Sequence, residues 1–214
     1  MATNARHTVD RLLDLAGRTY AAEAGISLKN TPAPLYQLLV LSVLLSTRIS
    51  ASIAVAAAIE LFKAGFGTPR RMLDASWQDR VDALGRGHYV RYDESTATAL
   101  GEGAALLQDS YGGDLRRLRD KADGDVRAIQ QLLRQVPRMG PVGAHIFCRE
   151  AQHVWPELRP YVDAKAAKGA EKLGLPTEAD RLVKLVGTDD LSGLTAALVR
   201  VSLDRTLADE VVER

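Results

Sequence analysis

The sequence predicts an all-α protein, and three observations support this. Alanine and leucine dominate the composition, and runs of β-branched residues are short. Apolar residues recur at helical spacing along most of the chain, and glycine or proline separates one periodic segment from the next. At 214 residues the chain can bury a sizeable core, arranged as one large domain or two small ones.

Composition narrows the class of protein. The formal net charge of +1 neither requires nor excludes a polyanionic partner, so binding to nucleic acid would depend on a local basic patch. Cys148 is the single cysteine, which excludes an intramolecular disulfide and cannot by itself hold a metal cluster. The sequence has no stretch of 18 apolar residues and no signal-peptide pattern, so we expect a cytoplasmic protein without a membrane partner.

Helical periodicity predicts the elements of the first half of the chain. An amphipathic helix is expected over residues 8–24, ended by Gly25. The next, over 35–45, is apolar nearly all round and too short to cross a membrane, so it should be a buried central helix. Further helices are expected over 51–64, from Pro69, over 76–84 and over 94–111. Ser76 and Asp79 have the spacing of a capping pair.

A helix–hairpin–helix is predicted at about residues 125–153. Its first helix has one apolar face, formed by Val126, Ile129, Leu132, Leu133 and Val136. Pro137 ends this helix, Gly140 and Gly143 allow a tight reversal with positive φ, and Pro141 suits the first turn of the second helix. The hairpin directs backbone N–H groups and a helix N-terminus outward, which suits a phosphate. Paired helices of this kind also serve purely to pack, so the hairpin alone leaves both roles open.

Four more helices are predicted after the hairpin. Asp163 stands at the head of the first, and aspartate is a good N-cap. Thr177 with Asp180 is expected to cap the second. Residues 189–204 and 207–212 supply the last two.

The hairpin and the aspartate together form a longer pattern. Pro137, Met139, Gly140 and Ala144 fit P-x-h-G-x-x-x-A, and Asp163 then precedes a helix. This pattern resembles the helix–hairpin–helix DNA glycosylases of the endonuclease III type, and the resemblance covers roughly residues 30–205. It implies a two-lobed helical fold. One lobe would comprise residues 30–157 with the helix–hairpin–helix, and the other 1–29 with 158–214.

The resemblance implies a base-excision DNA glycosylase. Such an enzyme flips a damaged or mismatched base out of duplex DNA and breaks its glycosidic bond through an oxocarbenium-like state. Asp163 matches the family's catalytic aspartate, which stabilises that cation and orients or deprotonates water. The N-cap and catalytic roles of Asp163 do not exclude each other. The alternatives are a catalytically degenerate DNA-binding protein on the same scaffold, and an all-helical interaction module.

The sequence departs from the family at the hairpin lysine, whose amine performs strand cleavage. Aligning the hairpin residues places Val142 at the lysine position, 21 residues before Asp163. An alternative register places His145 there and reproduces the family's usual interval of about 18 residues (163 − 145 = 18). Both registers remove the lysine, and Arg138 replaces the first hairpin glycine. We therefore expect a monofunctional enzyme without the amine-driven lyase activity.

The resemblance also assigns DNA contacts. Arg48 holds the place of a glutamine that fills the gap left by the flipped base, where an arginine can wedge, stack and reach a phosphate. A solvated arginine at a helix end is the alternative. Lys168 occupies one of the family's basic places after the aspartate. Hairpin contacts to DNA would come from Arg138, Gly140, Val142, Gly143 and Ala144.

Cofactors and partners follow from the same comparison. A single cysteine cannot form the four-cysteine iron–sulfur loop of many members, so we expect no cluster. Family hairpins often hold a monovalent cation, for which the carbonyls of Pro137, Met139 and Val142 are the candidates. Ser42 stands where adenine-removing relatives carry an acidic glutamate, so adenine is not the expected base. We expect a monomer that binds double-stranded DNA and associates with the nucleoid.

Overall fold

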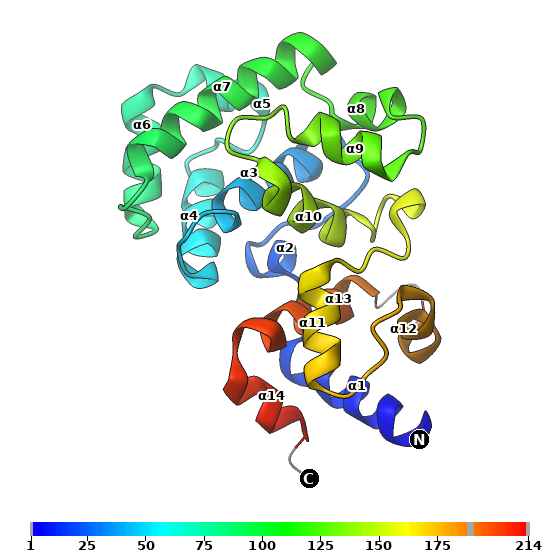
Figure 1. Ribbon diagram of the computed structural model, residues 1–214. Helices are drawn as coiled ribbons and strands as arrows, with labels where there is room; N and C mark the ends of the chain where they lie inside the picture. The colour runs from blue at the N-terminus through cyan, green and yellow to red at the C-terminus, as the bar shows by residue number, and fades with distance from the viewer. Residues whose placement is uncertain (1, 188–190, 213–214) are drawn as a thin grey trace. The chain divides into compact units, whose positions relative to one another are not determined.

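The computed structural model describes residues 2–187 and 191–212, and every regular element in these ranges is helical (Figure 1). The all-α prediction is therefore confirmed. The chain divides into two compact units. Unit 1 comprises the described residues of Met1–Tyr20 and Arg149–Arg214, and unit 2 comprises Ala21–Cys148. The sequence suggested boundaries at residues 30 and 157. The observed boundaries follow Tyr20 and Cys148, and each of them falls inside a helix.

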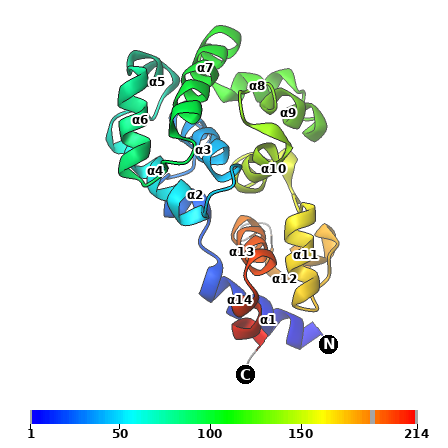
Figure 2. The ribbon, with the colours of Figure 1, turned by 60° about the vertical axis from the view of Figure 1, so that its left-hand side comes forward.

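Unit 2 contains most of the helices. They are, in chain order, α2 (Tyr20–Glu23), α3 (Pro32–Leu45), α4 (Ala51–Lys63), α5 (Pro69–Asp74), α6 (Trp77–Arg86), α7 (Asp93–Tyr111), α8 (Leu115–Lys121), α9 (Val126–Leu133) and α10 (Gly140–Ala151). Helices α2 and α10 each extend across a limit of the unit. Helix α3 lies in the middle of this group in both views (Figures 1 and 2). All of residues 35–44 except Gln37 are buried, which confirms the predicted central helix.

Local sequence explains where several of these helices begin. Ser76 Oγ accepts from the Asp79 N–H at 3.1 Å, and Asp79 Oδ2 accepts from the Ser76 N–H at 2.9 Å, so the predicted capping box is present. Thr68 Oγ1 accepts from the Arg71 N–H at 3.3 Å and precedes Pro69, a first-turn proline. These caps determine where the short helices α5 and α6 begin, and both helices pack against α7.

A buried arginine joins three helices of unit 2. Arg80 on α6 is 9% exposed, and its guanidinium donates to the carbonyls of Met72, Ala75 and Ala97 at 2.9 to 3.0 Å. Met72 lies on α5 and Ala97 on α7. Five fixed donors suit a guanidinium to this task, because it can serve several carbonyls at once.

Unit 1 packs helices from both ends of the chain around one apolar core. They are α1 (Ala2–Ala16), the 3₁₀ turn η1 (Pro156–Leu158), α11 (Ala164–Lys172), α12 (Ala179–Val186), α13 (Leu191–Leu203) and α14 (Arg205–Val212). Helices α11 and α13 lie side by side in both views (Figures 1 and 2). Gly169 permits this approach, since a Cβ built on it would lie 1.9 Å from the Leu198 carbonyl oxygen.

The expected N-terminal helix over 8–24 is wrong in its extent. Helix α1 begins at Ala2 and ends at Ala16, and the short α2 follows at Tyr20. Arg200 Nη1 donates to the Ala16 carbonyl at 2.8 Å, which satisfies an acceptor that the helix end leaves open. Gly17 follows, and glycine disfavours continuation of a helix. A contact from α13 therefore sets this end, and periodicity alone does not encode it.

Two further expectations need adjustment. Helix α12 has Glu178 as its N-cap without a side-chain hydrogen bond, so Thr177 does not cap it. Helix α9 ends at Leu133, before Val136, and a turn leads on to Pro137. The expected helix start at Asp189 lies outside the described residues.

Candidate functional site

The predicted helix–hairpin–helix is present as α9 and α10. Asp125 caps α9 by accepting from the Arg127 N–H at 2.8 Å. The hairpin between the helices has left-handed backbone at Arg138 (φ 61°) and at Gly140 (φ 50°). Glycine adopts this conformation without strain, whereas arginine does not. The first-turn amides of α10 at Gly140 and Val142 therefore follow a sharp reversal, and the Val142 side chain is 58% exposed.

Gly143 does not have the positive φ that the sequence suggested. It lies inside α10, and a Cβ built there would be 2.6 Å from Met139 Sδ and 3.4 Å from Ser46 Cβ. Glycine is needed because the hairpin and the segment after α3 press against this turn. The neighbouring Ala144 is 1% exposed. Gly143 thus lets this turn lie close to the end of α3, and neither Gly143 nor the buried side chain of Ala144 can contact a surface ligand.

Arg138 is anchored to the start of α7. Its Nη1 donates to Ser95 Oγ at 2.7 Å, and its guanidinium carbon lies 5.7 Å from the centre of the Tyr92 ring. The guanidinium of Arg91 lies 5.2 Å from the same ring. Two cations therefore share one aromatic ring at the exposed side of the hairpin.

The segment carrying Arg48 lies against the hairpin. Ser46 Oγ is 3.3 Å from the Arg138 carbonyl and donates to it, and Thr47 Oγ1 lies 2.8 Å from the Tyr89 hydroxyl. Arg48 itself is exposed. Residues 46–50, 87–95 and 137–142 are thus joined by hydrogen bonds, and we name them the loop cluster.

The loop cluster combines cations with exposed apolar side chains. Arg48, Arg91 and Arg138 are exposed, as are Val90 at 65% and Val142 at 58%. Asp93 and Glu94 at the start of α7 oppose part of this positive charge. Tyr89, by contrast, is fully buried, so this part of the 87–95 segment is a packed aromatic turn. The cluster can offer donors to phosphate and apolar surface to a sugar or base.

The hairpin carbonyls proposed for a cation are partly engaged. The Met139 carbonyl accepts from the Gly143 N–H at 3.0 Å, and Val142 lies within α10, where carbonyls accept helical hydrogen bonds. Pro137, Met139 and Val142 therefore do not form a set of free ligands, and we assign no chemical step to a cation. Nowhere in the described ranges do three or more His, Cys, Asp or Glu side chains gather as metal ligands.

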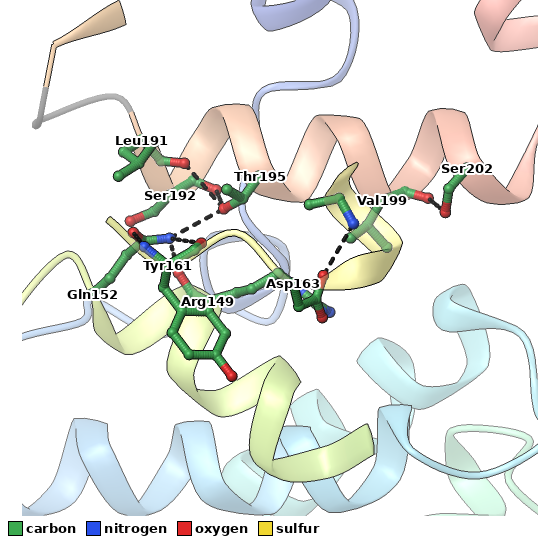
Figure 3. Close-up of polar contacts among 10 residues, drawn as sticks. Arg149, Gln152, Tyr161, Asp163, Leu191, Ser192, Thr195, Val199 and Ser202 are labelled. Carbon is green, nitrogen blue, oxygen red and sulfur yellow. Dashed lines mark hydrogen bonds and ion pairs between the residues drawn. The ribbon is translucent and has the colours of Figure 1, made fainter. Parts of the chain in front are cut away.

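Asp163 is the N-cap of α11 and is also ion-paired (Figure 3). Its Oδ1 accepts from the Ala166 N–H at 3.0 Å, and its Oδ2 pairs with Nη1 of Arg149 on α10. The Asp163 side chain is 6% exposed and that of Arg149 is 7% exposed. The structure thus gives Asp163 the predicted capping role and adds a buried cation beside it.

A buried glutamine organises the segment that leads to Asp163. Gln152 is 0% exposed, and its Nε2 lies within hydrogen-bond distance of the carbonyls of Arg149 (2.9 Å) and Tyr161 (3.2 Å) and of Thr195 Oγ1 (3.2 Å). Its Oε1 accepts from the Tyr161 N–H at 3.0 Å. These contacts join the end of α10, the approach to α11 and the helix α13 (Figure 3). Sequence reasoning missed Arg149, Gln152 and Thr195, and the available signal was polar residues within apolar helical segments.

Lys168 and Lys172, two lysines of α11, differ in environment. Lys172 Nζ donates to the carbonyls of Val201 at 2.9 Å and Ser202 at 3.1 Å, so it caps the end of α13. Lys168 is exposed on α11, as is Lys165. Lys172 is exposed as well, but its ammonium group is engaged by the end of α13, whereas Lys168 has no such contact among the described residues.

Other candidate residues have structural partners. Ser42 is fully buried and donates to the Leu38 carbonyl at 2.8 Å. His145 is half-buried. In the basic run before the hairpin, Arg116 binds Asp114 through Nε at 3.0 Å and Nη2 at 2.6 Å. These hydrogen bonds from Arg116 hold the pKa of the Asp114 carboxyl below its usual range. The positive charge of Arg116 is therefore compensated locally by Asp114.

The fold is similar to that of endonuclease III. No family model matches the sequence, and no curated protein matches it significantly. A solved structure of a trapped endonuclease III–DNA covalent intermediate, in an estranged-adenine complex, superposes with a TM-score of 0.52. The match covers 93% of this chain and 84% of that chain at 14% sequence identity. The chain therefore has the all-α helix–hairpin–helix glycosylase fold. Among the described residues, each helix is too short or too polar to span a bilayer.

Proposed function

We propose that this protein is a monofunctional DNA glycosylase of base-excision repair. It would hydrolyse the glycosidic bond of a damaged or mismatched base flipped from double-stranded DNA. The observation that carries the proposal is Asp163, which follows a helix–hairpin–helix and caps α11 with a fixed carboxylate. The endonuclease III structure with the same fold is a DNA complex, which supports DNA as the ligand class.

In this proposal Asp163 acts on the sugar. As the bond between C1′ and the base breaks, its electron pair leaves with the base and positive charge develops at C1′. The carboxylate stabilises that charge and accepts a proton from the attacking water. The departing base takes up a proton from solvent, and Asp163 returns to solvent the proton that it took from water. The products are a free base and an intact strand with an abasic site.

The backbone of the hairpin supports the register that puts Val142 at the lysine position. Left-handed conformations occur at Arg138 and Gly140, which are the two glycine positions of the motif in that register. The alternative register, with His145 as the counterpart, aligns the second glycine with Gly143, which lies inside α10. Valine has no amine to form a Schiff base, which supports hydrolysis without strand cleavage.

The loop cluster is the proposed contact with the DNA backbone. Arg48 and Arg138 supply cations, and the first-turn amides of α10 at Gly140 and Val142 supply neutral donors. Lys168 on α11 is a further exposed cation. Gly143 and Ala144 contribute indirectly, by letting the hairpin pack against α3.

A panel of duplexes, each with one modified or mismatched base, tests the proposal. We expect one lesion to be released by the wild-type protein, with strand cleavage only after alkali treatment. Asp163→Asn should abolish release. Asp114→Asn is the matched control, because Asp114 is also an N-cap aspartate paired with an arginine but lies on α8. Cleavage without alkali would contradict the monofunctional assignment.

One observation favours a second candidate function, a catalytically degenerate DNA-binding protein. Arg149 compensates the charge of Asp163, and a compensated carboxylate attracts a cation less strongly. This candidate predicts no base release from any duplex, together with salt-sensitive binding to a duplex containing an abasic site. If the protein neither releases a base nor binds DNA, the remaining candidate is an interaction module that does not bind nucleic acid.

A further inference from the structure

The carboxylate of Asp163 is held at both oxygen atoms. Oδ1 accepts from the Ala166 N–H at 3.0 Å, and Oδ2 is engaged by Nη1 of Arg149. At 6% exposure, the side chain has little opportunity to exchange either partner for water. Two donors from different segments therefore restrict it to one rotamer and one orientation of the carboxylate plane.

Arg149 is itself fixed in place. It lies in the last turn of α10, and its carbonyl accepts from Gln152 Nε2 at 2.9 Å. Gln152 also binds the N–H of Tyr161 at 3.0 Å, two residues before Asp163. One buried glutamine thus ties together the segments that carry the guanidinium and the carboxylate (Figure 3).

Arg149 supplies the positive charge that compensates the buried carboxylate of Asp163. Burying an isolated carboxylate is costly, and such a group takes up a proton or turns to solvent unless a cation compensates it. The N-terminus of α11 contributes only a partial positive charge. Arg149 is 7% exposed and is the full positive charge in contact with this carboxylate.

We infer that Arg149 is the positioning residue of Asp163 in base excision, an inference that rests on the function proposed above. Arg149 acts through the carboxylate, which it orients and whose charge it compensates, and it does not touch the reacting atoms. Its removal should therefore slow the chemical step and leave DNA affinity unchanged.

The test compares Arg149→Gln and Arg149→Lys with the wild-type protein on the duplex that it processes. We expect Arg149→Gln to lower the single-turnover rate of base release by about 100-fold, since loss of orientation costs a factor of this size. The Kd for the duplex should stay within about threefold. Arg149→Lys keeps the charge but loses the planar fork, so an intermediate loss of about tenfold is expected. Arg116→Gln is the control, because it removes the arginine of another N-cap ion pair, the less buried pair with Asp114 at the start of α8.

Stability measurements complete the test. Urea unfolding shows whether each variant is folded under assay conditions. A double-mutant cycle combines Arg149→Gln with Asp163→Asn. The unfolding equilibrium constant of the double variant should be about tenfold smaller than the value expected if the effects of the two single variants were independent. This coupling reports the ion pair independently of any activity.

Four results would overturn the inference that Arg149 positions Asp163 for catalysis. If folded Arg149→Gln releases the base at the wild-type rate, Arg149 is only structural, and if release is faster, Arg149 opposes catalysis. Additive effects in the cycle would show that the two residues do not interact in solution. An inactive wild-type protein would overturn the proposed function and this role with it. An active wild-type protein with an active Arg149→Gln variant would overturn this role alone.

Discussion

At the scale of single residues, the polar groups buried in unit 1 depend on one another. Asp163 and Arg149 compensate each other's charge, and Gln152 holds the segments that carry both. An unpaired charge in such surroundings costs far more than a surface ion pair contributes. The residue proposed for catalysis is therefore also a residue on which stability depends.

This dependence predicts the effect of Asp163→Asn on stability. Asparagine can still cap α11, but it leaves the 7% exposed guanidinium of Arg149 without a compensating charge. We expect the free energy of unfolding to fall by about 3 kcal/mol, measured by urea denaturation. A loss below about 1 kcal/mol would mean that solvent or another group already satisfies Arg149.

The partly buried ion pair between Asp114 and Arg116 at the start of α8 should contribute less to stability, and its contribution should depend on pH. Hydrogen bonds from Arg116 lower the pKa of Asp114 in the folded protein. Its stabilising contribution is thus fully present above the unfolded pKa of about 3.9 and is lost as pH falls through the folded pKa. Asp114→Asn should therefore cost about 0.5 kcal/mol at pH 7, and this cost should shrink as pH falls through the folded pKa. If the loss of stability caused by Asp114→Asn grew as pH fell, it would contradict this account of the ion pair.

At the scale of helices, close backbone contact sets the packing of α11 on α13. Gly169→Ala would place a Cβ 1.9 Å from the Leu198 carbonyl oxygen, so the helices must separate. We predict a loss of about 3 kcal/mol in unfolding free energy. Gly85→Ala in α6 is the matched control, since no atom lies within 4 Å of its added Cβ. It should gain about 0.5 kcal/mol from helix propensity.

Local signals predicted the helices well where local chemistry decides them. The capping box of Ser76 and Asp79 and the central helix α3 follow from spacing alone. The end of α1 at Ala16 does not, because Arg200 reaches it from 184 residues away. Gly143 was assigned a turn conformation, but it lies inside α10, where the side chain of Met139 packs close to it. Tertiary contacts, which have no local signature, account for both differences.

The candidate site was predictable to a similar extent. The motif and its spacing identified Asp163, and the structure places it at a helix N-cap as expected. Arg149 escaped notice because it stands 14 residues earlier as an ordinary basic residue in a helix. Its place within an apolar helical segment was the one local signal of burial, but that signal does not identify the carboxylate it pairs with.

At the scale of the whole molecule, the small net charge makes local patches decisive for DNA binding. The loop cluster gathers Arg48 and Arg138 on unit 2, although the chain carries a formal net charge of only +1. If each contacts one phosphate, Arg48→Ala and Arg138→Ala should each reduce the slope of log K against log salt concentration by about one. Lys63→Ala is the control, because Lys63 pairs with Glu60 on α4. Equal slopes for all variants would exclude the loop cluster as the DNA contact.

The single-turnover rate of base release on the best duplex of the panel tests the central claim most directly. It should be measured for the wild-type protein, Asp163→Asn and Asp114→Asn under conditions in which all three are folded and bound. The account predicts release by wild type and Asp114→Asn at similar rates, and no detectable release by Asp163→Asn with DNA affinity retained. Release by Asp163→Asn at the wild-type rate would contradict it, because the carboxylate would then take no part in the reaction.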